Sequence, residues 1–380
     1  MREGWTYKKL GEVAKVIMGQ SPDGNSLNSS NGIEFHQGKV FFGEKYLNVS
    51  NSFTEQPSKI AEPNSVLLCV RAPVGIVNIT QRRICIGRGL CAIQPNDIII
   101  MPFIFYALTQ KQAYFDKNST GSTFKAISSK VVLNTEIPTP PLSEQERIVS
   151  ELDLLSSVIK KKKAQLQEYD QLAKSIFYDM FGDPITNEKG WEVKKLGEVC
   201  EVTSSKRIFA NEYTSSGIPF YRGKEITEKS KGMPLSIELY ISEEMYKELK
   251  LIGIPQIGDV LITAVGTIGN IWVVNDNTPF YFKDGNVIWL KNIRMQNSVY
   301  FKFILEKLIE IYKQEMVRGA AYNALTIVNL KKMLVFLPPL TLQQQFAEKI
   351  EAIEKQKELI KQSITEAENL FSSRMDYYFN

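Results

Sequence analysis

The chain has 380 residues, of which 43% are hydrophobic and 23% charged, and 46 Lys and Arg against 42 Asp and Glu give a net charge of +4. This composition is typical of an ordinary soluble globular protein. The longest nearly continuous apolar stretch, residues 98–108, is shorter than the ~20 residues that a membrane helix needs, and the N-terminal MREGW has no apolar signal region. We therefore expect a cytoplasmic protein with no membrane partner.

The sequence contains few residues suited to redox, metal or triad chemistry. Its four cysteines show no CxxC spacing, and we expect reduced, buried thiols. The single histidine, His36, lies in a loop-like stretch, where a hydrogen-bonding or plain surface role is favoured over catalysis. No nucleotide-binding loop, nucleophile elbow or acidic-Pro-Pro-aromatic tetrad is present. These absences favour a non-catalytic chain with no cofactor or metal of its own, although an enzyme with an unrecognised site is a third reading.

The first predicted element, at the N-terminus, is also the first sign of an internal repeat. WTYKKLGEVAKV at 5–16 matches WEVKKLGEVCEV at 191–202 in 8 of 12 positions. Strand-like runs follow at 65–70, 74–79 and 89–94, and a short helix with Pro in its first turn is predicted at 102–116. In the second copy, strands are predicted at 260–264, 271–274 and 287–290, with a helix at 299–314. Both copies thus predict an α+β or mostly β globular domain.

A long helix is predicted to follow each globular half. PPLSEQ at 140–145 aligns with PPLTLQ at 338–343, and Ser143 and Thr341 are suitable N-caps, with Glu146 completing a capping box in the first copy. Apolar residues then repeat with alternating four- and three-residue spacing, as in a coiled coil, interrupted once in each helix by Lys162 or Lys357. The predicted helix-pairing residues are Ile148, Leu152, Leu155, Ile159, Leu166, Phe346, Ile350, Ile353, Ile360 and Ile364. The first helix should stop at Gly182, before Pro184.

The offset between the two copies separates a variable half from a length-locked half. It grows from 186 at the tryptophan motif to 198 at residue 121 and then stays constant to the end. We therefore divide the chain into residues 1–142, 143–182, 183–340 and 341–380, which are a globular domain, a helix, a second globular domain and a second helix. The simplest arrangement pairs the two helices with each other; the alternative packs each helix on its own globular neighbour.

Charge and loop composition permit nucleic acid as a partner. The globular segments 1–142 and 182–340 carry net charges of +5 and +2, whereas the helical segments 143–181 and 341–380 carry −1 and −2. A solvated basic surface is the plainer explanation. However, polar loops flanked by Gly recur at corresponding positions of both copies, and their side chains are of types that bind bases or phosphates. The candidate DNA-binding residues are Gln20, Ser21, Gln37, Lys39, Arg71, Arg88, Ser122, Thr123, Lys125, Lys206, Arg207, Arg222, Lys224, Thr267, Lys283, Arg318, Tyr322 and Asn323.

The doubled order of these motifs resembles the specificity subunit of type I restriction-modification systems. The resemblance rests on the two W…KLGEV openings, GQSP at 19–22, IGRGL at 86–90, PPLSEQERIV at 140–149, FGDP…GW at 181–191 and PPLTLQQQF at 338–346. It covers essentially the whole chain. The two halves also differ, since Arg71 corresponds to Val265 and no clear counterpart of Gln20 lies near residue 206.

The resemblance implies two target recognition domains, each recognising one half of a bipartite, gapped site in double-stranded DNA. It implies that the two long helices pack as an antiparallel coiled coil with pseudo-two-fold symmetry, set the gap and dock two modification subunits. Those partners would bind S-adenosylmethionine and methylate adenine N6, and two motor/nuclease subunits would complete a host-defence complex. The alternative hypothesis, from a different functional class, is a coiled-coil scaffold that carries two modules that bind ligands other than DNA.

Overall fold

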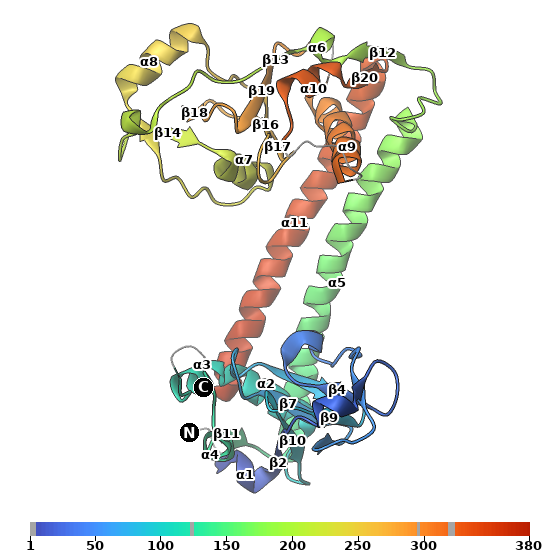
Figure 1. Ribbon diagram of the computed structural model, residues 1–380, viewed down its shortest axis with the longest axis vertical. Coiled ribbons are helices and arrows are strands. Elements are labelled where there is room, and N and C mark those ends of the chain that lie inside the picture. The colour runs from blue at the N-terminus through green and yellow to red at the C-terminus, as the bar shows by residue number, and fades with distance from the viewer. Residues whose placement is uncertain (1–4, 122–124, 295–296, 318–323) are drawn as a thin grey trace. The chain divides into compact units, whose positions relative to one another are not determined.

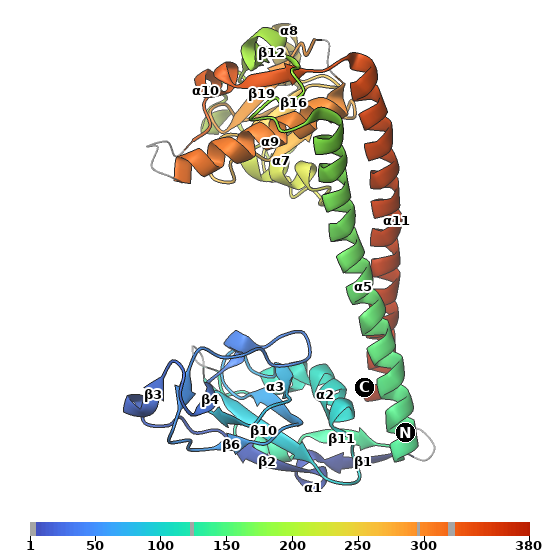
Figure 2. The same ribbon diagram turned by 90° about the vertical axis from the view of Figure 1, so that its right-hand side faces the viewer.

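The structure is a computed structural model that describes residues 5–121, 125–294, 297–317 and 324–380. It divides into two compact units (Figures 1 and 2). Unit 1 contains residues 1–165 and 360–380, and unit 2 contains residues 166–359. The two long helices, α5 (Leu142–Phe181) and α11 (Leu340–Phe379), contribute to both units. No helix in the described part of the chain is long and apolar enough to cross a membrane.

Unit 1 is built around a four-stranded antiparallel sheet in the order β2-β10-β7-β8. A five-stranded sheet in the order β3-β5-β4-β9-β6 contains the parallel pair β4–β9, and β1 pairs with β11. The strands are β1 (Thr6–Lys9), β2 (Ala14–Met18), β3 (Leu27–Asn28), β4 (Ile33–His36), β5 (Phe53–Thr54), β6 (Ile60–Ala61), β7 (Ser65–Cys69), β8 (Val77–Thr80), β9 (Ile84–Ile86), β10 (Leu90–Pro95) and β11 (Glu136–Thr139). The helices are α1 (Leu10–Val13), α2 (Met101–Gln110), α3 (Gln112–Lys117) and α4 (Ser129–Leu133), with 3-10 turns η1 (Gly24–Ser26) and η2 (Lys39–Phe41).

Unit 2 repeats this plan with two α-helices, at 223–230 and 243–252, that have no α-helical counterpart in unit 1. Its four-stranded sheet has the order β13-β19-β16-β17, β14 pairs in parallel with β18 and antiparallel with β15, and β12 pairs with β20. The strands are β12 (Glu192–Lys195), β13 (Glu201–Thr203), β14 (Ile218–Tyr221), β15 (Tyr240–Ile241), β16 (Val260–Thr263), β17 (Ile271–Val273), β18 (Tyr281–Phe282), β19 (Val287–Lys291) and β20 (Leu334–Leu337). The helices are α6 (Leu196–Val199), α7 (Gly223–Ser230), α8 (Glu243–Ile252), α9 (Ser298–Val317) and α10 (Ile327–Lys332), with the 3-10 turn η3 (Ala210–Glu212).

Helix α8 explains much of the growing offset. It lies between β13 and β16, where the sequence offset rises from 186 to 194, and the segment between β5 and β7 of unit 1 holds no helix. Ser242 caps its N-terminus by accepting a hydrogen bond from the Met245 amide, and Gly253 with φ of 137° ends it. The repeat therefore keeps its sheets and varies in the connections between them.

The two long helices run antiparallel within each unit. In unit 1, Glu151 pairs with Arg374 at 2.9 Å and Lys163 pairs with Glu368 at 2.7 Å, so partners on α11 move backwards as α5 advances. In unit 2, Asp170 pairs with Lys357 at 2.8 Å. Figures 1 and 2 both show the two helices side by side. The predicted helix pairing is confirmed. Lys357 can occupy a position in the apolar seam because its ammonium group forms ion pairs with Asp170 and Glu354.

Apolar burial joins each helix pair to a globular core. In unit 1, Ile148 and Leu152 of α5 and Phe379 of α11 belong to the same buried cluster as Phe103 of α2, and Figure 2 shows α2 between the four-stranded sheet and α5. In unit 2, Phe177 of α5 lies in one cluster with Phe346 of α11, Tyr300 and Phe301 of α9 and the strands β16 and β19. The alternatives of helix pairing and packing on a globular neighbour are therefore both realised.

Three local predictions need correction. Helices α5 and α11 begin at Leu142 and Leu340, so Ser143 and Thr341 lie inside the first turn and are not N-caps. The strand predicted at 74–79 begins only at Val77, because Gly75 with φ of 86° continues the turn. His36 lies on strand β4 and is 1% exposed, so a loop or plain surface position is wrong. The predicted C-cap Gly182, with φ of 78°, and the buried free thiols are confirmed.

Candidate nucleic-acid interface

Five loops meet at one edge of the unit 1 sheets, which we call the first loop edge; they comprise residues 19–21, 37–39, 70–72, 86–89 and 125–127. Backbone hydrogen bonds hold them together, and each comes at an end of β2, β4, β7 or β9 or directly before α4. The Gly87 amide donates to the His36 carbonyl at 2.8 Å, the Val70 amide to Gly89 at 2.9 Å and the Ile127 amide to Val70 at 2.9 Å. Gln20 joins the edge through its amide, which donates to the Ile86 carbonyl at 3.0 Å.

Two glycines let these loops approach one another. A Cβ at Gly89 would collide with the carbonyl oxygen of Gln37, and a Cβ at Gly19 would collide with the backbone of Gly87 and Leu90. A side chain at either position would push the loops apart, since the obstructing atoms belong to the backbone. The glycine-flanked loops of the sequence are therefore one contiguous structure.

The first loop edge presents polar side chains to solvent. Gln20, Gln37, Lys39, Arg71 and Arg88 are exposed, and within the described residues Lys39, Arg71 and Arg88 have no carboxylate partner. Unpaired Lys and Arg attract phosphate, whereas Arg and Gln suit guanine and adenine edges respectively. This surface can therefore bind an anionic polymer and discriminate among bases.

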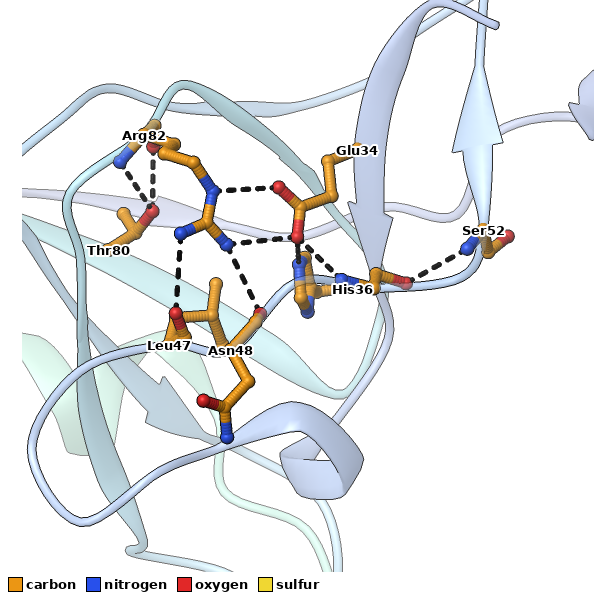
Figure 3. Close-up of polar contacts among 8 residues, drawn as sticks. Glu34, His36, Leu47, Asn48, Ser52, Thr80 and Arg82 are labelled. Atoms are coloured by element: carbon orange, nitrogen blue, oxygen red, sulfur yellow. Dashed lines mark hydrogen bonds and ion pairs between the residues drawn. The ribbon is translucent and has the colours of Figure 1, made fainter. Parts of the chain in front are cut away.

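An ionic network with two buried members, Glu34 and His36, and the half-buried Arg82 lies next to this edge (Figure 3). The Arg82 guanidinium donates to both carboxylate oxygens of Glu34, from Nε at 2.9 Å and from Nη2 at 3.0 Å, and also to the carbonyls of Leu47 and Asn48. His36 donates from Nε2 to Glu34 at 2.8 Å. Burial opposes the charge of Glu34, but the hydrogen bonds from Arg82, Ser50 and His36 outweigh it and lower its pKa to about 2. The network ties strand β4 to the segment at 47–50.

Burial favours the neutral form of His36. Burial lowers the pKa of His36 more strongly than Glu34 raises it, and Nδ1 is buried with no hydrogen-bond partner in the described part of the chain. A protonated ring would need an acceptor at that nitrogen. His36 therefore positions the strand end that carries Gln37 through its hydrogen bond to Glu34, and the predicted hydrogen-bonding role is confirmed.

The second loop edge, in unit 2, repeats the backbone frame of the first; it comprises residues 204–207, 222–224, 264–267, 283–286 and 325. The Lys283 amide donates to the Tyr221 carbonyl at 2.9 Å, as Gly87 does to His36. The Ala264 amide donates to Asn286 at 2.8 Å and the Leu325 amide to Ala264 at 3.0 Å, as in the other two bonds of the first frame. The sequences FHQGK (35–39) and FYRGK (220–224) occupy equivalent strands, so Gln37 corresponds to Arg222.

The side chains of the second loop edge are largely paired within the protein. Arg222 pairs with Glu225 and Glu238, each at 2.9 Å, and these carboxylates raise its pKa. Lys224 pairs with Glu238 at 2.6 Å. Outside these groups, Arg207 pairs with Asp284 at 2.8 Å, and no ion pair is recorded for Lys206 or Lys283 among the described residues. Sequence reasoning missed these counter-ions, although Glu225, three residues after Arg222, could have been recognised as a helix-capping carboxylate.

The remaining DNA-binding candidates differ in whether the structure describes them and in their exposure. Ser122, Thr123, Arg318, Tyr322 and Asn323 lie outside the described residues. Lys125 is exposed and pairs with Asp116 at 3.3 Å, and the Ser21 hydroxyl is buried without a recorded partner in the described chain. Thr267 is exposed, and its hydroxyl lies 3.0 Å from that of Thr227 on α7.

The helix-pairing candidates lie mostly in the interior. Ile148, Leu152, Phe346, Ile350, Ile353, Ile360 and Ile364 are buried, whereas Leu155, Ile159 and Leu166 are half-buried. No group of three or more His, Cys, Asp or Glu in the described chain has the geometry to hold a metal ion.

Two loop edges share one backbone frame and differ in side chains, and each belongs to a globular domain attached to a long helix. They define a class of protein built from two structurally repeated modules. Residues 2–168 and 188–369 match the family described as the type I restriction modification DNA specificity domain. The two matches together cover most of the chain, and the chain belongs to this family, whose members are specificity subunits of type I restriction-modification systems.

Curated relatives carry the same description. The chain is 25% identical over 383 residues to the MjaIX type I restriction enzyme specificity subunit of Methanocaldococcus jannaschii, which covers 90% of this chain and 85% of that one. A second protein of that organism, named for the MjaX type I restriction enzyme, is 37% identical over 178 residues, 46% of this chain and 42% of that relative. The EcoBI specificity subunit of Escherichia coli is 23% identical over 289 residues, 66% of this chain and 58% of that one.

Solved structures share the fold. The S subunit from M. genitalium superposes with a TM-score of 0.58 at 16% identity and covers 99% of this chain and 96% of its own. A chain from a solved type I R-M system superposes with a TM-score of 0.66 at 19% identity and covers 100% and 98%. The predicted α+β fold with two repeated globular domains and two long helices is thereby confirmed.

Proposed function

We propose that each globular domain recognises one half of a bipartite, gapped sequence in double-stranded DNA through its loop edge. The observation that carries this proposal is the shared frame of three backbone hydrogen bonds, which presents Gln37, Lys39 and Arg88 in unit 1 and Arg222, Lys224 and Asp284 in unit 2. A backbone frame that is the same in both domains, with side chains that differ, suits two sites that bind DNA in the same way but recognise different base sequences. The glycines bring the backbone close enough to enter a groove.

The difference in charge supports different half-sites. The first edge has unpaired arginines, which suit bidentate contacts to guanine O6 and N7, and two glutamines, which suit adenine. In the second edge, Arg222 and Lys224 share the carboxylate of Glu238, so this edge relies more on Lys206, Lys283 and the hydroxyl of Thr267. The bipartite target is therefore asymmetric, and its first half contributes the larger share of the salt dependence of binding.

The two long helices are proposed to set the unread gap and to dock the partner subunits. Both span 40 residues, and the second copy stays 198 positions from the first throughout this half of the repeat. Two modification subunits that bind S-adenosylmethionine would dock there and methylate adenine N6, and two motor/nuclease subunits would join through them. The chain itself supplies specificity and no catalytic group.

The test is a comparison of DNA binding and methylation by the whole complex. Purified chain with its modification subunits is mixed with duplexes that contain or lack the methylated sequence, at several salt concentrations. We expect binding that weakens with salt and methylation at one bipartite motif. Absence of salt-dependent binding in the complete complex would favour a coiled-coil scaffold with two modules that bind other ligands.

A further inference from the structure

A buried glutamine lies at the entrance of each long helix. Gln145 is the fourth residue of α5 and Gln343 the fourth residue of α11, 198 positions later, and they are 0% and 1% exposed. Buried uncharged amides without partners are rare in proteins, and both side chains use their amide oxygen as an acceptor and their amide nitrogen as a donor. Their position, burial and bonding recur in both copies.

In unit 1, Gln145 connects the first turn of α5 to the globular core. Its Oε1 accepts a hydrogen bond from the Ile100 amide at 2.9 Å, and its Nε2 donates to the carbonyls of Ile98 at 3.0 Å and Pro140 at 2.8 Å. Ile98 and Ile100 belong to the segment that leads from β10 into α2. One side chain therefore joins the helix, the strand that precedes it and the core of the same domain.

In unit 2, Gln343 makes the equivalent connection. Its Oε1 accepts from the Asn297 amide at 2.8 Å, and its Nε2 donates to the Pro338 carbonyl at 2.9 Å. Asn297 directly precedes α9, as Ile100 directly precedes α2. Asn297 also donates from Nδ2 to Gln344 at 3.1 Å, which adds a second bond between this segment and α11.

Only a primary amide satisfies this set of partners. Glutamine offers an acceptor and two donor hydrogens on one planar group, whereas glutamate at neutral pH accepts only and methionine of similar length does neither. An apolar side chain could fill the same space, but it would not fix the orientation of the helix, because apolar contacts lack the directional geometry of hydrogen bonds. The chemistry thus favours a role in orienting the helix over a role in filling the core.

We propose that Gln145 and Gln343 are positioning residues that fix the direction in which each long helix leaves its globular domain, and thereby restrict the complex to one gap length. This inference rests on the proposed function. A 40-residue helix is about 60 Å long, so a tilt of about 3° at its start displaces its end by about 3 Å. That displacement is about the 3.4 Å spacing of successive bases along a strand. Loss of the glutamine hydrogen bonds at the start of a long helix should therefore allow methylation at neighbouring gap lengths, while the recognised bases stay the same.

The experiment measures methylation in a plasmid library in which the gap of the wild-type site is varied by up to two base pairs in each direction. The complete modification complex contains wild-type chain, Gln145→Glu, Gln145→Met, Gln343→Glu or the control Gln167→Glu, an exposed position on α5. We expect the ratio of methylation at gaps changed by one base pair to methylation at the native gap to rise about fivefold or more in the Gln145 and Gln343 variants. The control and both half-site sequences should remain unchanged.

Two results would overturn the positioning role. One is normal methylation of the native site with the wild-type gap preference in all three variants. The other is complete loss of methylation by both Gln145→Glu and Gln145→Met, which would assign the glutamine to folding of the domain. If the wild-type complex methylates no bipartite site, the proposed function fails, whatever the variants do.

Discussion

His36, the one histidine of the chain, illustrates how burial assigns a role to a residue that its sequence neighbours leave open. The loop-like stretch FHQGK suggested an exposed ring, yet β4 places it behind the first loop edge with Nε2 on Glu34. Equivalent Tyr221 in unit 2 holds the same strand position without titrating near neutral pH, and burial raises its pKa to about 12. Both copies therefore bury a ring at this position, and in the second copy that ring is not an imidazole.

The histidine should leave a measurable pH dependence of stability. Because the pKa of His36 is lowered in the folded state, the unfolded chain binds a proton below about pH 6.5 that the folded chain does not, so the free energy of unfolding falls as the pH falls through this range. Glu34, with a pKa of about 2, stays charged between pH 5 and 7, and its contribution is lost only below pH 4.5.

Replacing His36 with Gln keeps a donor for Glu34 and removes the titrating group. Urea unfolding at pH 5, 6 and 7 should give a smaller change in free energy for His36→Gln than for the wild type. Equal slopes for the two proteins would refute this interpretation of the buried ring.

The unpaired arginines of the first loop edge should contribute directly to DNA affinity. Arg71→Gln and Arg88→Gln in the assembled complex should each weaken binding by about 1–3 kcal/mol if the side chain contacts a base, with relaxed discrimination in the first half-site only. If it contacts phosphate, binding should weaken equally on all sequences and the salt slope should fall by about 1. Fluorescence anisotropy with duplexes at several salt concentrations distinguishes these outcomes.

The matched control for these variants is Arg83→Gln. Arg83 lies just before β9, at the strand end away from Arg88, and pairs with Glu62 at 3.3 Å. It should leave affinity unchanged, and equal losses in all three variants would indicate non-specific charge effects.

At the scale of the element, each long helix packs both against the other long helix and against a globular core. The end of α5 that contains Phe177 and Phe181 packs against α11 and against α9 of the second globular domain. The Phe177 ring lies 5.8 Å from Phe346, 6.1 Å from Tyr300 and 6.2 Å from Phe303, measured between centroids. The predicted seam contains Phe346 but not Phe177, so spacing alone gives none of these three contacts.

Removal of this ring should destabilise unit 2. Phe177 is 1% exposed, and Phe177→Ala should lower the free energy of unfolding by about 3–5 kcal/mol. Leu172→Ala, on the same helix with a 45% exposed side chain, should change it by about 0.5 kcal/mol or less. Denaturant unfolding followed by circular dichroism measures both, and similar losses for the two variants would contradict the packing argument.

At the scale of the whole molecule, the proposed ruler can be lengthened without disturbing either loop edge. An insertion of seven residues preserves the seam and adds about 10 Å of helix, which is about three base pairs of DNA. Because the helices pair antiparallel, α5 and α11 must both be lengthened, after residue 163 and after residue 363.

The doubly lengthened chain should methylate a site whose gap is about three base pairs longer, with both half-sites unchanged. Methylation sequencing of a host that expresses the complete system measures this outcome. Insertion in α5 alone breaks the register and should abolish methylation. An unchanged gap in an active, doubly lengthened chain would disprove the ruler.

The sequence by itself determined the repeat, the two long helices, their apolar seam and the glycine that ends α5, because helix periodicity and capping are local properties. It also identified most of the exposed residues of both loop edges. Tertiary structure decided which of them are free. Glu238, 16 positions from Arg222, reaches it only when the segment at 238 folds against this loop edge, whereas Glu225 is a local partner three residues away. Tertiary structure also decided the bonding of Gln145 to Ile98, 47 positions away, and the burial of His36, since long-range partners and solvent access are set by packing and not by neighbouring letters.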